Sequence, residues 1–313
     1  MRTILSIAII TLFAAGSALA DREYVFDKKD NFDGAAVTSV SIDISHGDIA
    51  IEKSRGDDIE VFYKNIVYAR NQSEAEDINK DYQYSAEIVG GRLTIVIDEP
   101  RHDRRGKGIV ERIIEGDWSD ESNPMLKVSL PDGKAVEISS SSSDIEAADL
   151  KLDLDIESSS SDINVENTQG VFSCDVSSAD ITVTGHKGAV SVRGKSSDIR
   201  LVDIEGPINA HTSSGDVGVE KAKGSVEAFT ASGDCRLLDI DGDIDAEAAS
   251  GDIYVSGANG SVRASAVSGD VRLEGLSSKE AAYDVKSVSG DISMEVSRDF
   301  TGNDFEQTRF AGA

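Results

Sequence analysis

The chain has 313 residues, a formal net charge of −27 at pH 7 and only 5% aromatic residues. A surface this acidic excludes nucleic acid as a partner and argues against docking on anionic lipid, because both carry negative charge. Two interpretations of the charge stay open: it keeps strand edges of different molecules apart, or it attracts cations or a basic partner.

Residues 1–20 have the pattern of a secretory signal peptide. Arg2 supplies the positive end, residues 4–15 form an apolar core, and Ala18-Leu19-Ala20 is a small-residue cleavage motif. The apolar run is short for a membrane span, and Asp21 stands where a lipoprotein would have cysteine. We therefore expect export to the periplasm or cell surface, cleavage after Ala20, and no transmembrane segment in the mature chain.

Residues 21–135 are expected to form a β-rich cap with one short helix, covering an open strand edge of the repeats that follow. Alternating apolar residues predict strands at 40–44 and 59–63, and His46-Gly47-Asp48 looks like a degenerate repeat corner. Gly90-Gly91 predicts a hairpin between strands 86–89 and 93–97.

The predicted helix of this region begins at a capping box formed by Ser73 and Glu76 and ends near Tyr82. Residues 101–121 form a polar insertion that holds the one basic cluster of the chain, Arg101, Arg104, Arg105, Lys107 and Arg112. This basic loop is either solvated and without function or a contact for an acidic partner. Residues 126–130 then form a strand, and Pro131-Asp132-Gly133 a turn.

A repeat of 18 residues fills positions 136–297. A serine recurs at its corner, with an aspartate two residues later, at Ser142/Asp144, Ser160/Asp162, Ser178/Asp180, Ser196/Asp198, Ser214/Asp216, Ser232/Asp234, Ser250/Asp252 and Ser268/Asp270. A ninth copy, Ser289/Asp291, follows after 21 residues. A fixed period of this length indicates stacked structural repeats.

Each repeat contains two short strands. The first has apolar residues one and three positions after the aspartate, as in Ile253 and Val255, with polar residues between them. The second begins two residues after a glycine, at Phe172, Val190, Ile208, Val226, Ile244 and Val262. A further inward column near the first corner contains Leu150, Ile204, Ile240 and Leu276.

One repeat cannot fold alone. Its few buried side chains contribute roughly 2 kcal/mol each, whereas ordering its backbone costs ~18–36 kcal/mol. Stacking offsets that cost, so we predict an all-β fold: a parallel β-solenoid of about nine coils in which Ile253 lies beside Cys235 and Val271. The alternative, a row of antiparallel hairpins in a sandwich or barrel, would not require one corner to keep the same Ser and Asp.

The Ser/Asp corner has a structural and a functional interpretation. In the first, Asp accepts hydrogen bonds from turn N–H groups and Ser stacks in a hydroxyl ladder. In the second, the row of carboxylates binds a cation weakly, although one Asp per coil is fewer ligands than calcium sites use. The structural interpretation is favoured, and no metal or cofactor is predicted.

Two further features follow from the repeat. Cys174 and Cys235 lie more than three coils apart, too far for a disulfide, so both are predicted to be buried and unreactive. Residues 298–313 form a partial repeat, because 305–312 resembles 283–290 and so begins a tenth corner. Either that coil is left incomplete or a partner completes it.

No catalytic motif accompanies the repeat. The four histidines, His46, His102, His186 and His211, lack metal-ligand spacing, and no nucleophile or phosphate-loop motif occurs. We therefore predict a protein that is not an enzyme, without catalytic, cofactor-binding or metal residues. A polysaccharide-binding or polysaccharide-acting solenoid is the alternative, with Arg200, Arg236 and Arg272 as outward contacts and Phe229 and Tyr254 as the few outward aromatic residues.

The Ser-Gly-Asp corners that precede Ile or Val, as at Ser214-Gly215-Asp216 and Ser250-Gly251-Asp252, resemble the "putative adhesin" family of bacterial β-strand-repeat proteins. The Leu130-Pro131 entry strand does too, and the resemblance spans residues 125–313. It implies a solenoid fold and carries no functional residues to transfer. The Ser-Ser-Asp and Ser-Ala-Asp corners of the first four coils depart from the pattern, which is expected to change only the turn type.

The resemblance and the lack of catalytic motifs favour an exported, non-catalytic envelope protein, an adhesin-like or structural scaffold that presents a rigid acidic solenoid. Its partner is open: an envelope protein or a glycan.

Overall fold

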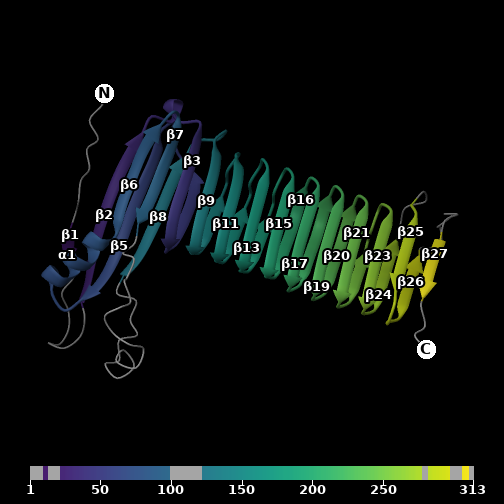
Figure 1. The fold of residues 1–313 in the computed structure, drawn as a ribbon. Helices are drawn as coiled ribbons and strands as arrows, with labels where there is room; N and C mark the ends of the chain where they lie inside the picture. Colours follow the sequence, from purple (N-terminus) through teal and green to yellow (C-terminus); the bar gives the residue numbers. More distant parts are fainter. Residues whose placement is uncertain (1–9, 13–21, 99–121, 277–280, 297–304, 310–313) are drawn as a thin grey trace, which may run out of the picture. The chain divides into compact units, whose positions relative to one another are not determined.

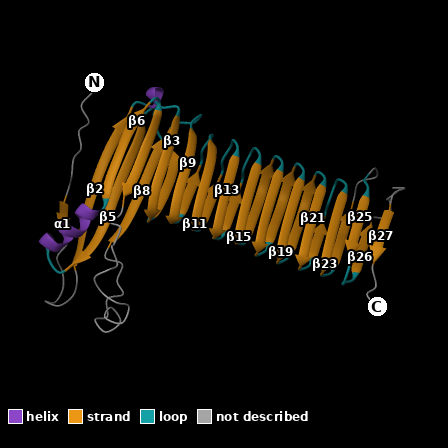
Figure 2. Cartoon of the chain, viewed as in Figure 1, coloured by secondary structure: helices purple, strands orange, loops and turns teal. Residues whose placement is uncertain are grey.

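The computed structural model describes residues 10–12, 22–98, 122–276, 281–296 and 305–309. These residues are almost entirely β-strand, with one α-helix (Figures 1 and 2). The chain divides into two compact units, Met1–Pro131 and Asp132–Ala313. The basic loop at 101–121 and most of the predicted signal peptide lie outside the described residues.

The first sheet of the N-terminal unit is mostly antiparallel. Its strands follow the order β1 (Ile10–Leu12), β2 (Arg22–Phe32), β5 (Ile59–Ala69), β8 (Ser122–Leu130) and β4 (Asp48–Lys53). Only β4 and β8 run parallel. The strand predicted at 59–63 is confirmed and continues to Ala69. β1 falls within the predicted signal peptide, and cleavage there stays a prediction.

The second sheet of this unit consists of β3 (Ser39–His46), β7 (Arg92–Asp98) and β6 (Gln83–Val89). β3 and β7 are parallel, and the predicted hairpin is confirmed by the antiparallel β6–β7 pair with Val89 opposite Arg92. A 3₁₀ turn, η1 (Gly34–Ala36), precedes β3. The core is made of alternate residues on these strands, buried as alternation predicts: Val40, Ile42, Ile44, Ile49, Ile51, Val61, Leu93, Ile95, Ile97, Leu126, Val128 and Leu130.

The helix α1 (Gln72–Asp81) exists, but the predicted cap is wrong. The cap is Asn71, whose side chain accepts the backbone N–H of Glu74 at 3.1 Å. Glu74 in turn accepts the N–H of Arg70 at 3.0 Å, which completes a capping box two residues before the predicted one. Asn is as good a cap as Ser, so Ser73 falls inside the first turn instead.

The C-terminal unit is a parallel β-solenoid, as predicted. In each coil one strand belongs to sheet A and the next to sheet B (Figure 1). Sheet A contains β10 (Ile145–Ala148), β12 (Ile163–Glu166), β14 (Ile181–Thr184), β16 (Ile199–Glu205), β18 (Val217–Lys223), β20 (Cys235–Asp241), β22 (Ile253–Ser256), β24 (Val271–Leu276) and β26 (Ile292–Val296). Neighbouring strands are parallel throughout.

Sheet B is parallel too. It contains β9 (Ala135–Ser142), β11 (Asp153–Ser160), β13 (Phe172–Ser178), β15 (Val190–Ser196), β17 (Ile208–Ser214), β19 (Val226–Ser232), β21 (Ile244–Ser250), β23 (Val262–Ser268), β25 (Tyr283–Ser287) and β27 (Phe305–Arg309). Parallel pairing rules out the hairpin alternative, because hairpin strands run antiparallel.

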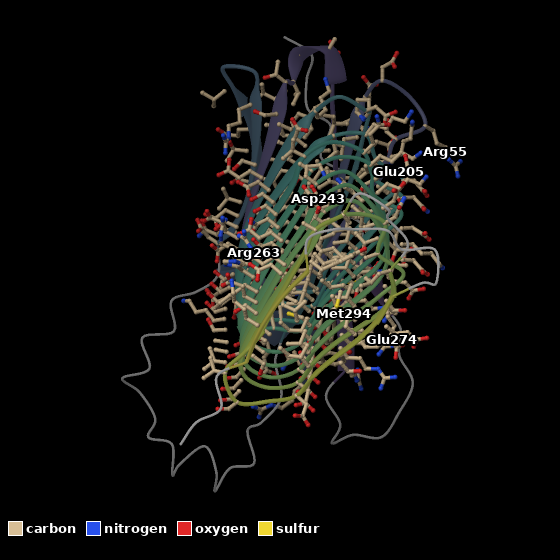
Figure 3. All side chains as sticks on the ribbon, turned by 90° about the vertical axis from the view of Figure 1, so that its right-hand side faces the viewer. Arg55, Glu205, Asp243, Arg263, Glu274 and Met294 are labelled. Carbon is tan, nitrogen blue, oxygen red and sulfur yellow. The ribbon has the colours of Figure 1, made fainter. Side chains whose placement is uncertain are left out.

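The register is one repeat per coil. Ile253 pairs with Cys235 on one side and Val271 on the other, so equivalent residues stack in files as expected. The inward files are fully buried, as Ile253, Val255 and Ala246 show. Viewed from the side in Figure 3, labelled Arg263 of sheet B and Glu274 of sheet A lie on the outward faces.

A third inward file lies near the first corner, where four apolar residues were predicted. Leu150, Ile204, Ile240 and Leu276 are buried there, and the same file also contains buried Ala222, Ala258, Thr168 and His186. Thr168 and His186 occupy neighbouring coils, and His186 Nδ1 lies 2.8 Å from Thr168 Oγ1. Mutual hydrogen bonding lets two polar side chains stand in an apolar file.

One position of each coil has a left-handed backbone, with φ between 52° and 73°. The file consists of Asp149, Asn167, Gly185, Asp203, Lys221, Asp239, Gly257 and Gly275. Gly, Asn and Asp tolerate this region best. Lys221 is therefore the strained member of the file.

The Asp corner has two versions. In the first four coils the residue before Asp is Ser143, Ser161, Ala179 or Ser197, and each is buried. From Gly215 onward it is glycine, and the space is used differently: Thr230 Oγ1 donates to the Gly215 carbonyl at 2.9 Å. The departure from Ser-Gly-Asp thus changes the packing inside the corner as well as the turn.

The last two steps of the stack are longer. Val262 pairs with Tyr283 and Val271 with Ile292, a shift of 21 residues that arises between β24 and β25. The partial repeat is confirmed in register, because Tyr283 pairs with Phe305 and Ser287 with Arg309.

Candidate interaction surface

The recurring aspartates form one row of hydrogen bonds along a corner of the solenoid. Oδ1 of each accepts the backbone N–H of the aspartate in the next coil, at 2.8 Å from Asp234 to Asp216 and from Asp252 to Asp234. Equivalent bonds link Asp162 to Asp144, Asp180 to Asp162, Asp216 to Asp198, Asp270 to Asp252 and Asp291 to Asp270. The structural interpretation of the Asp row is confirmed, and the N–H dipoles offset part of the repulsion between stacked carboxylates.

The serines of the corner stack through their backbones, as Ser232 and Ser250 do. The hydroxyl bonds involve their neighbours: Ser161 Oγ accepts the N–H of Ser143 at 3.1 Å, and Ser197 Oγ that of Ala179 at 3.2 Å. Within the described ranges, no group of three or more His, Cys, Asp or Glu side chains could hold a metal ion.

The outward face of sheet A carries an ordered chain of contacts. The Arg236 guanidinium lies 4.9 Å from the centre of the Tyr254 ring in the next coil. Tyr254 donates its hydroxyl to Glu274 Oε2 at 2.9 Å, and Arg272 forms an ion pair with the same carboxylate. The bonds from Arg272 and then Tyr254 lower the pKa of Glu274, so it stays charged.

Arg200 does not join this cluster. Gly218 separates it from Arg236 in the file, and its guanidinium lies 3.9 Å from Glu220. The structure therefore brings Arg236 and Arg272 together through Tyr254, which was not foreseen, and leaves Arg200 apart.

The outward face of sheet B is more acidic. Glu137, Asp155, Glu157 and Asp175 lie exposed on its first strands. Further along, Arg263 lies between two acids, 3.5 Å from Asp245 Oδ2 and 3.8 Å from Asp284 Oδ2. Phe229 packs against His211 with ring centres 4.9 Å apart. The two outward aromatic residues thus lie on different faces and form no common platform.

The cysteines and histidines are not assembled into a reactive site. Cys174 and Cys235 are free and buried, as predicted, and burial raises the pKa of each thiol to about 12. His186 is in the core, where burial lowers its pKa, while His46 packs edge-on against Tyr82 in the other unit. His102 lies outside the described residues. No described helix has the length and hydrophobicity to cross a membrane.

The comparisons with known proteins agree with this architecture. A family model described as Toastrack DUF4097 matches residues 37–237 and 221–311. No curated protein matches the sequence.

Solved structures with the same fold have low sequence identity. A "putative adhesin" from Parabacteroides distasonis ATCC 8503 is 13% identical, with 86% of this chain and 97% of that chain covered and a TM-score of 0.47. One from Parabacteroides merdae ATCC 43184 is 15% identical, with 87% and 96% covered and a TM-score of 0.39. A "Putative lipid binding protein" from Parabacteroides distasonis is 12% identical, with 87% and 97% covered and a TM-score of 0.35. Likenesses at this level do not indicate what the present chain binds.

Proposed function

The chain belongs to the Toastrack DUF4097 family, and from that membership we propose that it is a non-catalytic, adhesin-like interaction scaffold of the bacterial cell envelope. Its rigid solenoid presents ordered rows of charged side chains to a partner. Export through the predicted signal peptide belongs to the same proposal. N-terminal sequencing of the protein from a periplasmic or surface fraction is expected to begin at Asp21, and a sequence that begins at Met1 would contradict export.

The observation that carries the proposal is the hydrogen bonding of the Asp row. These acids recur in every coil, yet their Oδ1 atoms accept backbone N–H groups of the next coil. A catalytic carboxylate needs its oxygens available to the substrate and a pKa tuned to the reaction. The recurring residues thus maintain the stack, and the outward files are left for recognition.

The scaffold proposal is tested by measuring binding and turnover together. Immobilised mature chain is offered soluble envelope glycans and envelope proteins, and both saturable binding and released products are measured. We expect binding without chemical change of the bound molecule. Release of reducing ends or cleaved product that disappears in Glu274→Gln would overturn the non-catalytic assignment, with Glu247→Gln on the other face as the matched control.

A polysaccharide ligand is the second candidate, and the contacts of Tyr254 favour it over an unspecified surface. Its ring is fixed between Arg236 on one side and the Glu274–Arg272 pair at its hydroxyl. Rigid aromatic and guanidinium groups side by side are suited to stacking and hydrogen bonding with sugars.

The glycan candidate makes a distinct prediction on a glycan array. Saturable binding is expected to fall in Arg236→Ala and Arg272→Ala and to persist in Arg200→Ala, because Arg200 lies outside the cluster. Equal loss in all three variants would point to general charge attraction and not to a sugar site.

A further inference from the structure

A groove of about 430 Å³ follows the side of the solenoid where successive coils enter sheet B. One wall is a file of corner residues: Val171, Ala189, Pro207, Ser225 and Asp243. The other is the file of outward residues near the strand starts: Ser191, Asn209, Glu227 and Asp245. The buried first residues of β13, β15, β17 and β19 form its floor: Phe172, Val190, Ile208 and Val226.

Both walls change character in the same direction along the coils. The corner file begins with Val171, which is 53% exposed, and ends in Asp243. The strand file begins with Ser191 and ends in Asp245. The groove is therefore apolar at one end and acidic at the other, and no lysine or arginine lines it. Stacking alone requires no such gradient, because outward residues are free to vary from coil to coil.

The acidic end has acceptors in excess of donors. Asn209 Nδ2 donates to Glu227 at 2.9 Å, and Asp245 Oδ2 lies 3.5 Å from Arg263. The Oδ1 atoms of Asn209 and Asp245 are buried, and neither accepts a hydrogen bond from the described residues. Buried acceptors without donors are unfavourable, and a ligand with N–H groups would satisfy them.

We propose that this groove binds an organic cation, an ammonium group with an aliphatic chain attached. The ammonium would lie among Glu227, Asp243 and Asp245, and the chain would run over the floor toward Val171. Four coil steps of about 4.8 Å give roughly 19 Å for the whole ligand. The site is separate from the Asp row and from the sheet A face, so it does not depend on the proposed function.

Other ligand classes fit less well. The carboxylates at one end repel an anion, with no basic side chain in the lining to offset them. Strand addition has no free backbone partner here, since neighbouring coils pair at the floor: Val190 N–H donates to Pro207, Ile208 to Ser225 and Val226 to Asp243, each at 2.8 to 2.9 Å.

The test is calorimetric titration of the mature chain with octylammonium, and with octanoate and ethylammonium as matched probes. We expect saturable binding of octylammonium, none of octanoate, and at least about tenfold weaker binding of ethylammonium because the chain contact is missing. A capped peptide with one lysine between leucines forms the second arm. Binding of the peptide alone, with the same variant dependence, would assign the ammonium to a protein side chain and keep the site.

Variants locate the binding. The double change Glu227→Gln and Asp245→Asn is expected to weaken octylammonium binding about tenfold, whereas Glu247→Gln, on the same strand as Asp245 but outside the groove, leaves it unchanged. Val171→Ser is expected to weaken octylammonium and spare ethylammonium. Octanoate binding as tightly as octylammonium, no binding of either ammonium probe or the peptide, or a double variant that binds like the wild type, overturns the proposal.

Discussion

The backbone N–H of Asp234 donates a 2.8 Å hydrogen bond to Oδ1 of Asp216, the equivalent residue one coil earlier. Asp234 itself accepts the N–H of Asp252 in the same way. Each interior aspartate of this kind therefore links three coils, and the most regular acid of the sequence is explained by backbone hydrogen bonding.

This role predicts different results for two substitutions of one residue. Asp234→Ala removes the acceptor of the Asp252 N–H and is expected to cost about 0.5–1.5 kcal/mol of unfolding free energy. Asp234→Asn keeps an Oδ1 acceptor and relieves like-charge repulsion of about 1 kcal/mol, so its stability is expected to match or exceed that of the wild type. Urea denaturation measures both. If Asn costs as much as Ala, the charge matters more than the acceptor.

Close stacking at the corner predicts intolerance of any side chain at Gly251. A Cβ there would lie 1.8 Å from the Gly233 carbonyl oxygen, so the backbone has to shift. We expect Gly251→Ala to cost roughly 1–3 kcal/mol. Gly218→Ala is the control, because its Cβ would meet no listed atom nearer than the Ile199 carbonyl oxygen at 3.8 Å. Comparable thermal stability of the two variants would refute the corner geometry.

The left-handed file predicts a stabilising change at Lys221, whose φ is 57°. Lys221→Asn removes part of the strain that a longer side chain meets there and is expected to raise the unfolding free energy by about 0.5–1 kcal/mol. The control is Lys223→Asn on the same strand β18, outside the left-handed file, where no gain is expected. A gain of equal size at both positions would attribute the effect to charge, since both changes remove a lysine.

Buried His186 predicts a loss of stability on mild acidification. Burial lowers its pKa below the ordinary value of 6.5, against the opposing hydrogen bonds to Gly170 and Ala189. The unfolded chain then binds the proton more readily, so the contribution is complete above pH 6.5 and declines as the pH falls toward the folded pKa, by at most about 1.4 kcal/mol per pH unit.

The measurement is urea denaturation at pH 7.5 and 5.5. His186→Leu, which matches Leu150 and Leu276 of the same file, is expected to show a smaller pH dependence, and His211→Gln the full one. Equal pH dependence in all three proteins would place the titrating group elsewhere.

The two thiols are predicted to be inert in the folded protein. Because burial raises the pKa of Cys174 and Cys235 to about 12, almost no thiolate forms at pH 8. A thiol reagent is expected to label neither cysteine until urea unfolds the chain, and then both. Rapid labelling of Cys235 without unfolding would show that sheet A opens locally.

The solenoid could be predicted from the sequence because its files are filled by residues of one kind. Ile253, Val255 and Val271 recur at the repeat period and alternate with polar residues, so both strand type and register follow. The third file was predicted only in part, since Thr168 and His186 break the apolar pattern that defines it. Their mutual hydrogen bond, which makes burial tolerable, is visible only in three dimensions.

Local signals also competed where two choices were similar. Asn71 and Ser73 are both good helix caps with Glu three residues later, and the sequence does not distinguish them. The Arg236–Tyr254–Glu274 contacts and the groove beside Asn209 needed the register first, because each joins residues from different coils. The outward files, which vary most, were consequently the least predictable part.

The longer step near the end of the stack has a consequence for how such a protein can diversify. Asp291 still donates to Asp270 Oδ1 at 2.7 Å, although 21 residues separate them instead of 18. Additional chain can therefore be accommodated between β24 and β25 without interrupting the row of aspartates. Duplicating a whole coil lengthens the solenoid, while insertion at a corner changes only the local surface, so span and binding specificity can evolve independently.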